Sequence, residues 1–176
     1  MTGAPLIYIS LGTVFNELPA FYRACFSAFG DMPYQVVMAI GKNTDRSQLG
    51  ATPANFIVSD FVPQLDLLER AALFITHGGM NSANEGLLYG VPLLVVPQRG
   101  DQYMVAGRVA ELSAGLPLFT PEATPERLRG MAVHLMTDPR FKEGAQRLSQ
   151  SLKAAGGYRR AADEILLFKQ RMGTGS

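Results

Sequence analysis

The chain has 176 residues, of which 47% are hydrophobic and 18% charged, and its net charge is +1 at pH 7. This length suits one domain, and the near-neutral charge gives no general attraction to nucleic acid or anionic membranes, so neither is expected as a partner. The single cysteine, Cys25, excludes an internal disulfide framework and indicates a reducing, cytoplasmic location. The sequence has neither a signal peptide nor an apolar run long enough to cross a bilayer.

Apolar runs alternate with helical patterns along the chain. Strands are predicted at Leu6–Ser10, Tyr34–Ile40, Asn55–Val58, Leu73–Thr76, Pro92–Val96 and Leu116–Phe119. Helices are predicted at Leu18–Phe29, Gln64–Arg70, Asn81–Tyr89 and Asp101–Leu112, and then in a tail at Pro125–Met136, Arg140–Ala155 and Tyr158–Arg171. Continuous apolar strands separated by helices predict an α/β fold, with a parallel sheet of about six strands, helices on both faces and a helical C-terminal tail.

A histidine and two glycines follow the predicted strand Leu73–Thr76. Gly78 and Gly79 allow a tight turn and a close approach of the backbone to a ligand. The helix that begins near Met80 presents free N–H groups and the positive end of its dipole toward this turn. His77 adds an imidazole N–H. The arrangement predicts a phosphate site at the end of a buried strand, where open α/β sheets bind ligands.

Polar side chains extend this candidate site in both directions along the sequence. Asn81 and Ser82 add an amide and a hydroxyl at the helix start, and Glu85 lies one turn further, placed to accept hydrogen bonds from a ribose diol. The next predicted strand ends shortly before Asp101 and Gln102, a carboxylate and an amide side by side that can grip adjacent sugar hydroxyls. Together the two clusters predict a site for a nucleotide diphosphate sugar.

Each candidate also has a structural interpretation. His77 could be a structural histidine at a strand end, and the polar residues after it could cap the helix. Glu85 could be a solvated helix residue and Asp101 the N-cap of the next helix, whereas Gln102 has no comparable structural role. His134 lies in an amphipathic helix with no pattern of metal ligands around it, and it is expected to be structural or exposed.

Four motifs, in order, resemble one known family. HGGMNSANE followed by PQRGDQ resembles the nucleotide-sugar signature of the family 1 GT-B glycosyltransferases, which include macrolide, plant and animal UDP-glycosyltransferases. Ile7–Thr13 resembles the first strand and loop of their C-terminal, donor-binding domain, and FVPQ at positions 61–64 resembles their W-x-P-Q uridine-binding element. The macrolide glycosyltransferases are the most similar group, and the resemblance extends from about Pro5 to Ser113.

The resemblance implies a role for each matching position. The implied UDP-sugar site comprises Ser10, Gly12, Thr13, Phe61, Val62, Gln64, His77, Gly79, Met80, Asn81, Ser82, Glu85, Asp101 and Gln102. Phe61, where the family often has Trp, would stack on the base, and the Val62 backbone would bond the uracil edge. Gln64 and Glu85 would hold the ribose. The helix start and His77 would hold the diphosphate with the first loop, and the Asp-Gln pair would orient the sugar.

The same resemblance implies a Rossmann-like fold and an inverting transfer of a hexose from UDP-sugar to the hydroxyl of a small-molecule acceptor. It implies no metal and no cofactor. The family's catalytic His, with its Asp partner, belongs to an N-terminal acceptor domain, so no catalytic residue is expected in this chain. Residues 1–172 are expected to form the donor domain, and residues 173–176 a flexible tail or a vector remnant. The low charged fraction predicts an apolar surface patch for the acceptor domain or for self-association.

Two other functions remain open on the sequence alone. The chain could be a module that binds UDP or a nucleotide sugar and performs no chemistry in isolation. It could also be a dinucleotide-dependent oxidoreductase, which is disfavoured because no G-x-G-x-x-G follows the first predicted strand.

Overall fold

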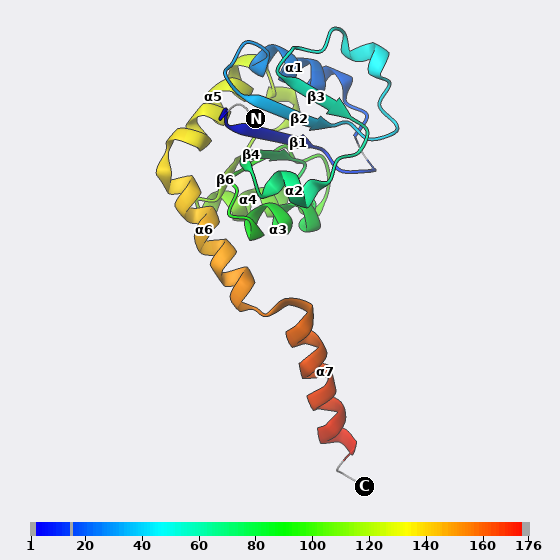
Figure 1. Cartoon of the computed structure of the whole chain (residues 1–176), viewed down its shortest axis with the longest axis vertical. Coiled ribbons are helices and arrows are strands. Elements are labelled where there is room, and N and C mark those ends of the chain that lie inside the picture. Colours follow the sequence, from blue (N-terminus) through cyan, green and yellow to red (C-terminus); the bar gives the residue numbers. More distant parts are fainter. Residues whose placement is uncertain (1–2, 15, 174–176) are drawn as a thin grey trace.

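The computed structural model describes residues 3–14 and 16–173, which build a six-stranded parallel sheet between two layers of helices (Figure 1). The strands are β1 (Leu6–Ser10), β2 (Gln35–Ala39), β3 (Phe56–Ser59), β4 (Ala71–Thr76), β5 (Leu93–Val95) and β6 (Gly115–Pro117). Their order across the sheet is β3-β2-β1-β4-β5-β6, the order of a Rossmann fold. The predicted fold class is confirmed, and each predicted strand is present with its ends shifted by no more than about two residues.

The predicted helices are also present. They are α1 (Pro19–Phe29), α2 (Gln64–Leu68), α3 (Met80–Leu88), α4 (Asp101–Glu111), α5 (Pro125–Thr137), α6 (Pro139–Ala154) and α7 (Gly157–Gly173). Two short 3-10 helices, η1 (Arg46–Leu49) and η2 (Thr120–Glu122), were not expected. Such single turns have no apolar repeat that a sequence pattern could reveal. At the start of α5 the Thr124 side chain accepts a hydrogen bond from the Arg127 N–H and so caps the helix as a Thr-Pro start predicts.

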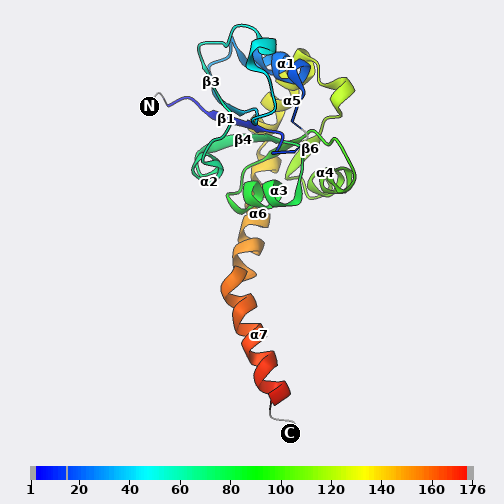
Figure 2. The same cartoon turned by 90° about the vertical axis from the view of Figure 1, so that its right-hand side faces the viewer.

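The sheet buries a different set of side chains on each face. Ile7 and Ile9 of β1 point into the layer that contains α1 and α5, where Cys25 is fully buried. Tyr8, between them, points into the layer that contains α2, α3 and α4. Figure 2 shows these two helical layers on opposite sides of the strands. Because strand side chains alternate between faces, the same pattern places Tyr8 and Ser10 on one side.

The last two helices leave the body of the domain. The Lys142 ammonium of α6 donates to the Gly90 carbonyl at 2.8 Å, and the Ser149 hydroxyl donates to the Leu88 carbonyl at 2.6 Å, so α6 is fixed to α3. Beyond Gly156, α7 projects away from the sheet, and its described side chains are exposed (Figures 1 and 2). Gly173, expected in the tail, is the last residue of α7, and residues 174–176 lie outside the described residues.

Exposed apolar side chains are concentrated on α7. They include Tyr158, Ile165, Leu166, Phe168 and Met172. The expected self-association through an exposed inter-domain face stays a prediction. No helix within residues 3–14 and 16–173 is both long enough and apolar enough to span a bilayer.

The strand order creates one crevice at the carboxyl edge of the sheet. β1 and β4 are hydrogen-bonded neighbours, and their ladder pairs Tyr8 with Phe74 and Ser10 with Thr76. The chain leaves β1 toward α1 on one face and leaves β4 toward α3 on the other face. Because these two connections diverge, they leave a space between them, and α/β sheets bind ligands at this kind of position.

Helices α3 and α4 end in the same hydrogen-bonded turn. After α4, Ser113 N–H donates to the Ala110 carbonyl and Ala114 N–H to the Val109 carbonyl, both at 2.9 Å. After α3, Gly90 and Val91 make the equivalent bonds, also within 3.0 Å. The residue at the turn must have a positive φ, which is 64° at Gly90 and 53° at Ser113.

We therefore expect Ser113→Gly to stabilise the domain. The left-handed conformation costs a residue with a Cβ roughly 1–2 kcal/mol, part of which the greater freedom of glycine in the unfolded chain offsets. A net gain of about 1 kcal/mol should raise Tm by about 2–4 °C in a thermal melt. Gly90→Ser is the converse control and should lower Tm, because it places a Cβ on a residue with a positive φ. The new Cβ would make only ordinary contacts, at 3.4 Å or more, so a clash would not contribute to the loss. A lower Tm for Ser113→Gly would contradict this account of the turn.

Candidate functional site

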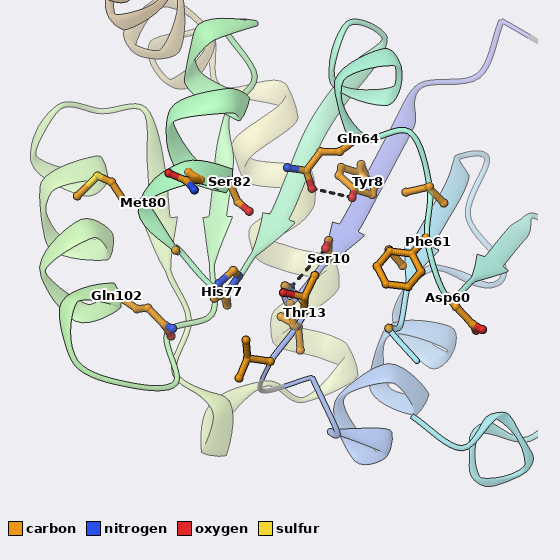
Figure 3. A pocket seen from close by; sticks show the side chains of 18 residues that line it. Tyr8, Ser10, Thr13, Asp60, Phe61, Gln64, His77, Met80, Ser82 and Gln102 are labelled. Carbon is orange, nitrogen blue, oxygen red and sulfur yellow. Dashed lines mark hydrogen bonds between the residues drawn. The ribbon is translucent and has the colours of Figure 1, made fainter. Parts of the chain in front are cut away.

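A pocket of about 590 Å³ occupies the crevice between β1 and β4 (Figure 3). The segments after β1, β3 and β4, together with the start of α3, form most of its walls. Most of the predicted site residues line it, namely Ser10, Gly12, Thr13, Phe61, Val62, Gln64, His77, Gly79, Met80, Asn81, Ser82 and Gln102. Glu85 and Asp101 do not line it. The structure thus brings two loops that are 65 positions apart in sequence, at Gly12 and His77, to one site.

The imidazole of His77 lies between two glycine backbones. A Cβ placed on Gly12 would lie 2.7 Å from Cε1 of the ring, and one placed on Gly79 would lie 2.5 Å from Nε2. Both distances are far below a normal contact, so only glycine fits beside the ring. Gly12 also has a φ of 84°, which favours glycine for a second reason. The ring is therefore held in place by packing against the two loops that meet in the pocket.

Burial lowers the pKa of His77 below its usual value of 6.5, and the negative charge of Asp101 opposes this effect. The Nδ1 atom is buried and has no hydrogen-bond partner among the described residues. At neutral pH the imidazole is consequently uncharged. A neutral ring carries one N–H donor, and an anion placed beside it would favour protonation.

The N-terminus of α3 opens into the pocket. Gly79 is the N-cap residue, and no side chain among the described residues caps this helix end. The Ala83 N–H donates to the Gly79 carbonyl at 2.9 Å and is the first to bond within the helix. The N–H groups of Met80, Asn81 and Ser82 precede it and are available for an anion, and the helix dipole adds to their attraction. The alternative that Asn81 or Ser82 caps the helix is wrong.

Gln64 connects two other polar groups at the opposite wall of the pocket. Its Oε1 accepts a hydrogen bond from the Tyr8 hydroxyl at 2.9 Å (Figure 3). Its Nε2 donates to Oε2 of Glu85. Glu85 is half-buried behind Gln64 and is held by it. Tyr8 lines the pocket and was missed in the sequence analysis. Its signal was present, because a tyrosine two residues before Ser10 in a strand must face the same side as that serine.

Phe61 presents an aromatic surface to the pocket. Its side chain is 55% exposed, so Phe61 is not a core residue. The Lys42 ammonium lies 5.4 Å from the centre of the ring, a distance that allows a cation–π contact. Val62 is half-buried. It packs against the core layer that contains α2, α3 and α4, and it also lines the pocket. An aromatic ring that is exposed at the mouth of a pocket can stack on a flat ligand group.

The structure corrects the interpretation of the Asp-Gln pair. The Gln102 Oε1 accepts hydrogen bonds from the N–H groups of Gln98 and Arg99, at 2.8 and 3.1 Å. Gln102 thus has a structural role that the sequence analysis did not recognise, although its side chain still reaches the pocket. Asp101 is the first residue of α4 and the N-cap is Gly100, so Asp101 is not the cap. It is exposed and lies close enough to His77 to affect its pKa.

The second histidine of the chain, His134, lies outside the pocket. His134 is exposed on α5, and its ring packs edge-on against Phe141 at 5.2 Å, in agreement with the sequence analysis. Within the described ranges, no group of three or more His, Cys, Asp or Glu side chains is arranged to hold a metal ion. In the same ranges, no lysine or arginine lines the pocket between β1 and β4.

Residues 23–159 match the family described as "Erythromycin biosynthesis protein CIII-like, C-terminal domain". The chain belongs to this family. It is therefore the C-terminal domain of a GT-B glycosyltransferase, and the resemblance noted in the sequence is confirmed. This membership leaves no support for the oxidoreductase alternative.

Known glycosyltransferases match the domain along nearly its whole length. The NDP-glycosyltransferase YjiC of Bacillus licheniformis is 45% identical over 95% of this chain and 42% of its own length. The crystal structure of CalG4, the calicheamicin glycosyltransferase, has a TM-score of 0.92 and 36% identity, over 97% of this chain and 44% of its own. Glycosyltransferase VinC in complex with DTDP has a TM-score of 0.73 and 28% identity, over 92% and 42%. This chain thus spans less than half the length of the proteins it matches.

The packing of His77 in this glycosyltransferase domain can be tested without a ligand. Gly79 has a φ of −59°, which alanine tolerates, so most of the cost of Gly79→Ala comes from the contact of the new Cβ with the ring, and a smaller part from the loss of glycine at the N-cap. We expect a loss of about 1–3 kcal/mol in the free energy of unfolding, measured by chemical denaturation. In a His77→Ala background the loss should fall below about 1 kcal/mol, because the clash is gone.

The control for this pair of measurements is Gly107→Ala, since a Cβ at Gly107 in α4 would meet no atom within 4 Å. It should be neutral or slightly stabilising in both backgrounds. An equal cost of Gly79→Ala with and without the imidazole would show that His77 does not occupy this position.

The lowered pKa of His77 also predicts how stability depends on pH. Below about pH 6.5 the unfolded chain binds a proton at His77 that the folded chain resists, so the free energy of unfolding falls as the pH drops from that value toward the lower folded pKa. Above about pH 6.5 the neutral His77 ring makes its full contribution to the free energy of unfolding. Denaturation between about pH 5.5 and 7.5 should show a slope that His77→Ala reduces. An identical slope in the wild type and His77→Ala would contradict burial of the neutral ring.

Proposed function

We propose that this domain binds UDP and a UDP-sugar, as the donor-binding part of an inverting glycosyltransferase that transfers a hexose to the hydroxyl of a small-molecule acceptor. The fold, the family and the pocket at the β1–β4 crevice support this role. Since the chain spans less than half the length of its relatives, the transfer reaction belongs to the proposal for the whole enzyme.

The open N-terminus of α3 is the observation that supports a diphosphate most directly. It offers the N–H groups of Met80, Asn81 and Ser82 at the floor of a pocket whose described walls carry no lysine or arginine. The His77 imidazole and the Ser82 hydroxyl lie beside them (Figure 3). Oriented N–H dipoles, rather than cationic side chains, would then compensate the charge of the diphosphate without a metal.

The other end of the pocket suits a nucleoside. The exposed ring of Phe61 provides a stacking surface for the base, and the Val62 backbone beside it provides hydrogen-bonding groups for the base edge. Gln64, backed by Glu85, would hold the ribose. The match to VinC, whose structure contains DTDP, supports a nucleoside diphosphate as the class of ligand. UDP is our specific proposal, from the resemblance of FVPQ to a uridine-binding element.

The sugar would lie toward Gln102. Its Nε2 is the amide group left to face the pocket, because Oε1 is engaged by two backbone N–H groups. Asp101 would approach the sugar from the rim. In the proposed reaction the acceptor oxygen attacks the anomeric carbon, the bond to the diphosphate breaks, and the diphosphate leaves with the electron pair. The site at α3 would stabilise that developing charge, and a base outside this chain would accept the proton.

On its own, the domain is expected to bind the donor and not to catalyse transfer. This expectation concerns this chain alone, which spans 44% of the length of CalG4. Transfer should appear only when an acceptor-binding domain is present. A cytoplasmic location stays a prediction from the single cysteine.

Calorimetric titration of the folded chain with UDP, UDP-glucose and NAD tests the proposal. Saturable binding of UDP, and no binding of NAD, is expected. His77→Ala should weaken UDP binding by about 1–3 kcal/mol, because it removes a hydrogen bond to a charged group. His134→Ala is the matched control, since this histidine is exposed on α5 and outside the pocket, and it should leave the affinity unchanged. A folded chain that fails to bind UDP would sink the proposal, and unchanged binding by His77→Ala would remove the role of the imidazole.

A further inference from the structure

Tyr8 is fixed more firmly than the other polar groups of the pocket. It lies in the central strand β1 and is 1% exposed. Its ring stacks on Phe74, its partner in the β1–β4 ladder, with the ring centres 4.7 Å apart and the planes at 9°. The hydroxyl at the end of this stacked ring reaches the pocket and donates to the Gln64 Oε1 at 2.9 Å (Figure 3). The core of the domain therefore holds one hydrogen-bond donor at a fixed point of the pocket wall.

That donor decides how the Gln64 amide is oriented. A glutamine amide can point its oxygen or its nitrogen to either side, and the surrounding hydrogen bonds select between the two. Burial raises the pKa of Tyr8 to about 12, although a hydrogen bond with Ser10 lowers it and the charge of Glu85 adds only a smaller increase, so the phenol stays protonated and can donate. On the other side of the amide, the carboxylate of Glu85 can only accept. Tyr8 and Glu85 together therefore select the orientation in which oxygen faces the phenol and nitrogen faces the carboxylate.

Gln64 needs this support because little else fixes it. It is the first residue of α2, a helix of five residues, and its side chain is half-buried. Reversal of the amide would place its oxygen against the Glu85 carboxylate, a repulsive arrangement, and would turn Nε2 away from that carboxylate. Without the phenol, the amide would lose the bond that holds its oxygen, and both Gln64 and Glu85 would become less ordered at the proposed ribose position.

We infer that Tyr8 is a positioning residue for recognition of the ribose hydroxyls, acting through Gln64 on the Gln64–Glu85 pair. This inference rests on the proposed function, since it concerns the ribose of the bound nucleotide. Tyr8 need not touch the ribose. Its hydroxyl holds an amide whose remaining donor and acceptor capacity, with the carboxylate behind it, matches the two hydroxyls of a ribose diol.

Discrimination between ribose and deoxyribose is the measurement that tests this role. The wild-type chain and Tyr8→Phe are titrated with UDP and with 2′-deoxyuridine diphosphate. The wild type should prefer UDP by about tenfold, the effect of roughly one well-formed hydrogen bond to a charged group. Tyr8→Phe keeps the stacking on Phe74 and should weaken UDP binding about three- to tenfold, while binding of the deoxy ligand changes by less than about twofold.

Two further variants separate this role from a loss of stability. Gln64→Leu should reduce the preference for UDP as Tyr8→Phe does, and addition of Tyr8→Phe to Gln64→Leu should reduce it no further. Tyr22→Phe is the matched control, because Tyr22 is a fully buried tyrosine on the other face of the sheet, outside the pocket, whose hydroxyl donates to the Asn16 carbonyl at 3.0 Å. Tyr22→Phe should lower Tm and keep the wild-type preference.

The outcomes distinguish this inference from the proposed function. A wild-type preference for UDP that persists in Tyr8→Phe or in Gln64→Leu overturns the positioning role alone. Equal binding of the two ligands by the wild type overturns it as well, although the diphosphate site would stand. Failure of the folded wild type to bind either ligand overturns the proposed function and this inference together. A preference lost in Tyr8→Phe and kept in Tyr22→Phe supports the role.

Discussion

The fit of one imidazole between two glycine backbones determines the shape of the pocket. His77 is the first residue after β4, while Gly12 belongs to the loop after β1, so their contact fixes the distance between the two loops that meet at the crevice. Gly79, on the other side of the ring, is the N-cap of α3, and the ring therefore also fixes where that helix begins. The helix dipole is thus aimed at the pocket by packing, before any ligand is present.

The proposed anion site relies on backbone N–H groups and has no cationic side chain among its described walls. The described pocket walls contain neither lysine nor arginine, and the one imidazole is neutral because it is buried. Fixed N–H dipoles would attract an anion without the strong hydration of an ammonium or guanidinium group, so the proposed transfer would need little reorganisation as charge develops on the diphosphate. On the opposite wall the groups are also held by neighbours. The Tyr8 phenol donates to the Gln64 amide, and that amide donates to the Glu85 carboxylate.

The fold and most of the pocket could be predicted because they follow from local patterns. Apolar strands separated by helices predict a parallel sheet, and the divergence of β1 and β4 then places His77 and Gly12 together. Contacts that depend on the direction of a side chain could not be predicted. The Gln102 oxygen turns back to its own loop, and Asp101 lies outside the pocket wall although it is next in sequence. Glu85 is bound to Gln64 and does not line the pocket, a detail that spacing along the helix does not encode.

The exposed helix α7 has a consequence for the handling of this domain. Within the described residues, α7 contributes nothing to either core layer and nothing to the pocket between β1 and β4. It is joined to α6 through Gly156 and Gly157, both with positive φ, so the chain changes direction at a point where few side chains pack. The ligand-binding unit and the apolar helix are thus mechanically separable. A chain truncated after Ala155 would keep every residue that lines the pocket and would lose the exposed apolar side chains of α7. Such a chain is the natural starting material for crystallisation and for exchange of donor sites between related enzymes.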